Sequence, residues 1–191
     1  DVTGGGWQPG VLAPGGSVRL RLLVTPLAAA RGGTPLNVYV TARSATSLTA
    51  RDTVKASTTC IAVYRPDALI YDGTVYAGDD IYNTTGAGQS CSQTTTPRRG
   101  VYYYPKLYND GNTVESFVVR GSAGNAQWTV TYLDFATGAD ITADVTGAGW
   151  QTPILAPRGN RRLKILVMPA ATTAPGDALS ILVTATSVGD A

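Results

Sequence analysis

The chain has 191 residues, 15% of them charged, and a formal net charge of +2 at pH 7. This small charge argues against a nucleic-acid partner, and no apolar run reaches the ~18–20 residues that a membrane span needs. Histidine is absent, which excludes Ser–His and Cys–His nucleophiles and disfavours zinc. We therefore predict no enzymatic activity and no cofactor.

The chain begins with a segment that recurs near its end. Residues 1–44 match residues 144–187 without gaps, and about half of the aligned positions are identical. Such a repeat predicts a duplicated folding unit. Within the first copy, Val18–Thr25 and Leu36–Ala42 alternate apolar and polar residues, which predicts two half-buried strands, and Pro26 ends the first of them. The second copy keeps both alternations.

Residues Asp52–Val63 predict a further, edge-like strand. Pro66 restricts the residue before it to extended conformations, so we expect a short, stiff linker around Tyr64–Asp67. The duplication then predicts two domains: residues 1–63 form the C-terminal part of one β-sandwich repeat, and residues 64–191 form a second repeat that lacks its last strand.

Short strands separated by turn residues continue through the second repeat. The predicted strands are Ala68–Tyr71, Val101–Tyr108, Ser116–Arg120 and Trp128–Leu133. Pro105 implies an edge or a bulge, because proline cannot donate to a ladder. No stretch of ten or more residues has apolar spacing of 3.6. These features predict an all-β chain made of immunoglobulin-like antiparallel β-sandwich repeats in tandem.

Two cysteines, Cys60 and Cys91, lie far apart in the sequence, and neither belongs to a CxxC motif. In an oxidising compartment they would form a disulfide, which we predict. The alternative is two buried free thiols.

Polar turns supply the candidates for a metal site and for modification. Asp79, Asp80 and Asn83, and separately Asp110 and Asn112, could offer oxygens to calcium, but neither group matches an EF-hand loop. Aspartate and asparagine also favour turns for local reasons, so structural turns are the preferred interpretation. Asn83-Thr84-Thr85 satisfies the N-x-T sequon for glycosylation.

Aromatic and basic side chains predict a possible contact surface. Strand parity places Tyr102, Tyr104 and Tyr108 on one side, opposite Tyr103, where they could pack, contact a subunit or stack on a glycan. Arg162 and Lys164 share the outward face of another strand. Such a face is usually solvated and guards an edge, and the alternative is binding of a polyanion or sugar.

Several motifs resemble a known family. The sequences PDALI (66–70), GDDIYN…GQ (78–89), YNDGNTVESFVV (108–119) and Trp150…LAPRG…LKILVMP…VTATS are similar to secreted repeats of bacterial cell-surface proteins. Those repeats are related to the cell-adhesion-related domains found in bacteria (CARDB-like). The resemblance implies an immunoglobulin-like sandwich, a secreted or cell-surface location and a structural role with no fixed catalytic residue. A cysteine pair is not a general feature of the family.

The two copies are cut at different points of the repeat. The first continues past Ser44 into Asp52–Val63, whereas the second reaches Ala191 where the equivalent strand is expected. An open edge is a template for strand addition. We therefore expect the chain to associate with its own kind in an extracellular fibre, either by covalent repetition or by strand exchange. The alternative is a carbohydrate-binding accessory module that presents the tyrosines to a polysaccharide.

Overall fold

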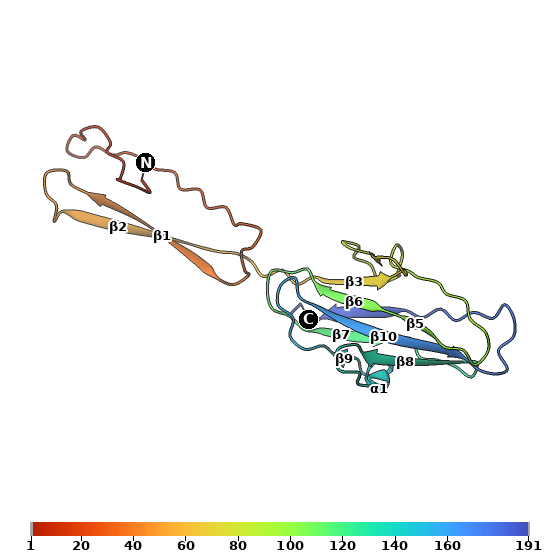
Figure 1. The fold of residues 1–191 in the computed structure, drawn as a ribbon. Coiled ribbons are helices and arrows are strands. Elements are labelled where there is room, and N and C mark those ends of the chain that lie inside the picture. The colour runs from red at the N-terminus through yellow and green to blue at the C-terminus, as the bar shows by residue number, and fades with distance from the viewer. Residues whose placement is uncertain (1, 191) are drawn as a thin grey trace.

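A computed structural model describes residues 2–190 and is all-β apart from one short helix, α1 (Thr142–Thr146). The chain forms two parts that lie end to end (Figure 1). The N-terminal part contains one antiparallel hairpin of two nine-residue strands, β1 (Pro35–Arg43) and β2 (Arg51–Thr59). The C-terminal part contains every other strand among the described residues.

The larger sheet of the C-terminal part is built around one long strand, β10 (Asn160–Pro169). One edge of β10 pairs first with β6 and then with β5, and its other edge pairs with β8. The remaining strands extend the sheet beyond β6 in the order β6-β3-β4. Their bounds are β3 (Pro66–Tyr71), β4 (Tyr76–Ala77), β5 (Val101–Tyr103), β6 (Pro105–Asn109) and β8 (Trp128–Asp134).

A smaller antiparallel sheet has the order β11-β7-β9, with β7 (Phe117–Gly121) in the centre, β9 (Trp150–Gln151) on one side and β11 (Val183–Ser187) on the other. Inward residues of the two sheets form a single core. The larger sheet contributes Leu107, Val130, Tyr132, Leu163, Ile165 and Val167, and the smaller sheet contributes Phe117 and Val119. The alternation of buried and exposed residues along β10 is what a strand covered on one face requires.

Most of the predicted strands are confirmed. Leu36–Ala42 lies within β1, most of Asp52–Val63 lies in β2, and the predicted strands of the second repeat match β3, β7 and β8 to within a residue or two. Val101–Tyr108 is divided into β5 and β6 immediately before Pro105. Proline has no N–H for the ladder, so the interruption occurs where the sequence predicts an irregularity.

The strand predicted at Val18–Thr25 is wrong, because the structure assigns no strand there. In Figure 1 this stretch follows an extended course near the hairpin. Its counterpart in the second copy is β10, which has partners on both edges. Alternation predicts which face a strand would bury, but a strand forms only where another backbone accepts its hydrogen bonds.

Equivalent residues of the two copies differ sharply in burial. Leu163 and Ile165 are 0% and 1% exposed, whereas the matching Leu20 and Leu22 are 56% and 49% exposed. Trp7 and Leu12 are likewise exposed. The first copy therefore has the sequence pattern of a folded half unit without the opposing sheet that covers the second copy.

Candidate functional site

The predicted contact residues lie on the outer face of the larger sheet. Tyr103 pairs with Ile165 and packs against the core, so Tyr102 faces outward and is 41% exposed. Arg162 and Lys164 alternate with buried Leu163 on β10 and also face outward. The five predicted residues thus share one face, but they fall into two groups along it.

The first group, which we call the aromatic–basic face, consists of Tyr102, Tyr104, Phe135, Arg162 and Lys164. The rings of Tyr102 and Tyr104 are stacked with centroids 6.5 Å apart, and Tyr104 meets Phe135 edge-on at 6.1 Å. Lys164 Nζ lies 4.2 Å from the centroid of Tyr102, and Arg162 Cζ lies 4.1 Å from that of Phe135. Cations at these distances are attracted to the ring faces, which keeps the rings and charges together on the surface.

Tyr108 belongs to a second group, centred on Lys106. Lys106 Nζ lies 4.5 Å from the ring centroid of Tyr76 and 5.7 Å from that of Tyr108. Tyr76 in turn packs against Tyr71 at 5.4 Å. Sequence reasoning did not find Lys106 or Tyr76, although the alternation of β6 places Lys106 on the same face as Tyr108.

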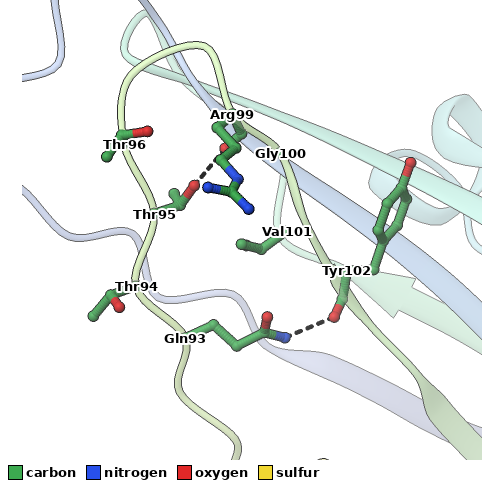
Figure 2. A pocket seen from close by; sticks show the side chains of 8 residues that line it. All are labelled: Gln93, Thr94, Thr95, Thr96, Arg99, Gly100, Val101 and Tyr102. Carbon is green, nitrogen blue, oxygen red and sulfur yellow. Dashed lines mark hydrogen bonds between the residues drawn. The ribbon is translucent and has the colours of Figure 1, made fainter.

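A pocket of about 560 Å³ opens beside Tyr102 (Figure 2). Its walls are fixed by local hydrogen bonds: Gln93 Nε2 donates to the Tyr102 carbonyl at 2.6 Å, and Thr95 Oγ1 donates to the Arg99 carbonyl at 2.6 Å. The lining is mostly amide, hydroxyl and guanidinium groups, from Gln93, Thr94, Thr95, Thr96, Arg99, Gly100, Val101 and Tyr102. These are groups that can hydrogen-bond to hydroxyls or carboxylates. Sequence reasoning did not identify this pocket, because a Thr-rich loop resembles any polar linker.

The predicted calcium candidates are only partly brought together. Tyr82 Oη bridges Asp80 Oδ1, at 2.8 Å, and Asp110 Oδ2. Asp110 also faces the Arg65 guanidinium at 3.9 Å. Asn112 points away from these carboxylates, toward the N-terminal part. Among residues 2–190, no group of three or more His, Cys, Asp or Glu side chains is arranged to hold a metal ion, so calcium binding stays a prediction.

A buried carboxylate, Asp67, joins this acidic cluster and was missed from the sequence. It is 2% exposed, and its Oδ2 accepts the Asp80 N–H at 3.2 Å. Burial raises the pKa of Asp67; the hydrogen bond from Asp80 opposes that rise, and the charges of Asp79 and Asp110 add to it. The Asp80 carboxylate acts in the same direction. The three neighbouring carboxylates, of Asp79, Asp80 and Asp110, therefore all favour a protonated Asp67.

Asn112 connects the two parts of the chain. Its Oδ1 accepts the Val63 N–H at 2.8 Å, and its Nδ2 donates to the Ile61 carbonyl at 3.0 Å. The backbone of Asn112 adds two hydrogen bonds. Its N–H donates to the Val63 carbonyl, and its carbonyl accepts the Gly32 N–H. Asn112 thus acts as a junction residue, and no metal role is visible in these contacts.

The predicted disulfide is wrong for this structure, in which Cys60 and Cys91 are both free and partly exposed. Cys60 lies beside Asn112, whose Nδ2 is 3.5 Å from its Sγ. Cys91 instead lies near Tyr103 on β5.

The ladder along β10 explains why these thiols do not meet. Tyr103 pairs with Ile165, whereas Tyr108, which precedes the Asn112 turn, pairs with Asn160. Five strand residues separate those positions, which is ~17 Å, whereas a disulfide needs Cα atoms within about 7 Å.

Asn83 uses its side chain within its own loop. Nδ2 donates to the Ala87 carbonyl at 2.9 Å, and Oδ1 accepts the N–H groups of Thr85 and Gly86. A glycan on Nδ2 would have to form alongside this contact, and glycosylation at Asn83 stays a prediction.

Among the described residues no helix is long and apolar enough to cross a membrane. No protein-family model matches the chain, and a search of curated proteins finds no match to it.

Proposed function

We propose that the chain is a structural repeat of an extracellular bacterial fibre, stalk or surface-layer protein. In this proposal its units are immunoglobulin-like β-sandwiches joined end to end, by covalent repetition or by strand exchange, and they carry no catalysis. Each unit buries its own core, so stability grows with the number of units and the array stays extended.

One observation carries this proposal: leucines of the first copy are about half exposed where the matching leucine and isoleucine of the second copy are buried. Burying an aliphatic side chain contributes roughly 1.5–3 kcal/mol. A sequence that keeps such residues at equivalent positions gains that stability only when a second sheet covers them. The covering sheet must resemble the smaller sheet, β11-β7-β9, whose Phe117 and Val119 share the core with Leu163 and Ile165.

A permuted protein tests the equivalence of the two copies. A second copy of residues 64–143 is fused ahead of residue 1, so that residues 1–63 can complete a whole unit. We expect the amides of residues 18–24 to change from rapid to slow hydrogen exchange and the N-terminal part to unfold cooperatively. Rapid exchange throughout that stretch would show that the copies are not equivalent. Filaments in electron micrographs of native material would support the fibre itself.

The aromatic–basic face favours a second candidate function, a module that binds an acidic polysaccharide. Exposed rings stack on sugar faces, and the cations of Arg162 and Lys164 complement uronate carboxylates. The adjacent pocket supplies hydroxyl and amide partners.

Affinity electrophoresis in gels that contain alginate or pectin tests this candidate. We expect retardation that is lost in Tyr102→Ala and in Lys164→Gln. Tyr39→Ala is the matched control, because Tyr39 is an exposed ring with Lys55 Nζ 5.9 Å away, but it lies in the N-terminal hairpin. Equal retardation of all variants, or none of the wild type, would exclude this candidate.

A further inference from the structure

Among residues 2–190, strand β11 pairs along one edge, with β7, and its other edge is open. The Ser122 N–H donates to the Leu182 carbonyl and the Val188 N–H donates to the Ser116 carbonyl, so even-numbered residues of β11 direct their backbone toward β7. By the alternation of an antiparallel ladder, Val183, Ala185 and Ser187 direct theirs the other way. The nearby strand β3 belongs to the larger sheet, and no ladder joins it to β11.

The first copy shows what occupies the same edge. The equivalents of Val183, Ala185 and Ser187 are Val40, Ala42 and Ser44. The Ser44 N–H donates to the Ala50 carbonyl, so the even-numbered residues of this strand direct their backbone N–H and C=O groups toward β2. The edge that β2 occupies on β1 is therefore the edge that is open on β11 among the described residues.

The side chains of β2 suit that position. Val54 and Ala56 pair with Val40 and Val38 on the same face, while Thr53, Lys55 and Ser57 form the other, polar face. The equivalents of Val40 and Val38 are Val183 and Ile181, which pack against the core. Val54 would therefore lie beside Val183, and Ala56 beside Ile181.

Strand β2 is also weakly held in its present place. All nine of its residues are exposed, and β1 is its only partner in the described part of the chain. An isolated two-stranded hairpin is marginally stable in water. By contrast, β11 belongs to a sheet that is packed on a core, so a strand added there gains apolar contacts as well as backbone bonds.

We propose that β11 is the acceptor for β2 of a second copy of this chain, in antiparallel register with Val54 opposite Val183 and Asp52 opposite Ala185. In the complex β2 leaves its own β1. Because donor and acceptor lie in different parts of the chain, the contact is head-to-tail and can repeat along a filament. This inference rests on the proposed function and specifies one means of joining units.

Two variants test the contact from its two sides. Ala185→Pro removes the N–H that faces the open edge. The hydrogen bonds to β7 are unaffected because they come from the even-numbered residues, and proline is tolerated on edge strands. Val54→Asp puts a carboxylate on the apolar face of the donor strand. The matched controls are Ala185→Ser, which keeps the N–H, and Thr53→Asp, which adds the same charge to the opposite face.

Light scattering after size exclusion gives the readout. We expect the wild type and both controls to form a concentration-dependent series of oligomers, and each variant alone to stay monomeric. An equimolar mixture of the two variants should stop at a 1:1 dimer, because Ala185→Pro retains a donor and Val54→Asp retains an acceptor. A wild type that is monomeric at every concentration, a mixture that does not dimerise, or oligomers of Ala185→Pro equal to the wild type's would overturn the inference.

Hydrogen exchange on the wild type gives an independent test that needs no variant. The amides of Val183, Ala185 and Ser187 should exchange rapidly in the monomer and slowly in the oligomer, whereas Thr184 and Thr186 should be slow in both. Oligomers in which the first three amides stay fast would also overturn it. If native material forms filaments but the wild type is monomeric, this inference is wrong and the proposed fibre stands. If the variants form 1:1 dimers but native material forms no filaments, the proposed fibre is wrong and the contact between β2 and β11 stands.

Discussion

Two buried aspartates of the larger sheet have opposite electrostatic surroundings. Burial raises the pKa of Asp134, but hydrogen bonds from Arg161 Nη2 and from Thr137 Oγ1 outweigh this effect and hold the pKa below its usual value. Asp67 has no cationic partner in the described part of the chain, so burial and the neighbouring carboxylates dominate and its pKa is raised. Ionisation of Asp134 therefore stabilises the fold, whereas ionisation of Asp67 destabilises it.

Replacing Asp67 should stabilise the protein at neutral pH. Because its folded pKa is raised, its contribution to stability is complete below the unfolded pKa of about 4 and is lost as the pH rises through the folded value. Asp67→Asn cannot ionise and keeps an oxygen for the Asp80 N–H. We expect the midpoint of thermal unfolding to rise by about 2–4 °C at pH 7, as about 1 kcal/mol does in a protein of this size, and to match the wild type near pH 3.

The control for this experiment is Asp72→Asn. Asp72 accepts the N–H groups of Val75 and Thr74, which lower its pKa. Its substitution should give no gain at pH 7. A lower midpoint for Asp67→Asn at pH 7 would contradict the expected sign and would mean that an ionised Asp67 is compensated in solution.

For single residues, the sequence predicted the face of the sheet on which a side chain lies better than it predicted the residues that the side chain contacts. The parity that separates Tyr103 from Tyr102 follows from a period of two and could be read directly. Phe135 could not be placed on the same face, because it follows β8 at the start of a turn, where parity ends. Asp67 lies on the outer face of β3 and is buried there, and nothing local in the sequence predicts that burial.

Single strands show what a partner sheet contributes. β10 and residues 18–25 have nearly the same alternation, yet only β10 forms a strand, because it has β5, β6 and β8 to bond. The prediction from sequence therefore identified the apolar face of both segments and could not tell which of them is paired. The same limit applied to the cysteines, since their separation depends on the register along β10.

The matched pair Leu163→Ala and Leu20→Ala measures this difference. Leu163 is fully buried among Leu107 and Tyr132, so its truncation should lower the free energy of unfolding by about 2–5 kcal/mol. Leu20 is 56% exposed, so the same change should stay within about 0.5 kcal/mol. Urea unfolding measures both. Equal losses would mean that the first copy is covered in solution.

For the whole molecule, the relation between the two parts depends on a few hydrogen bonds at one residue. Asn112 joins the 61–63 segment through its side chain and backbone and holds Gly32 through its carbonyl. In the proposed fibre, each unit has to transmit its direction to the next. The extended arrangement in Figure 1 therefore relies on a junction with little apolar burial, since Ile61 and Val63 are both exposed.

Asn112→Ala should loosen this junction without unfolding either part. It removes the two side-chain hydrogen bonds to Val63 and Ile61. At about 1 kcal/mol each, their loss corresponds to roughly a thirtyfold increase in opening. Chymotrypsin cleavage after Tyr64 should accelerate by about that factor, and small-angle scattering should show a broader distribution of lengths. The control is Asn83→Ala, which breaks a comparable set of loop bonds away from the junction. If Asn112→Ala matches this control in both measurements, the alignment of the units comes from contacts other than those of Asn112, and the junction stiffness must be sought in the backbone around Pro66.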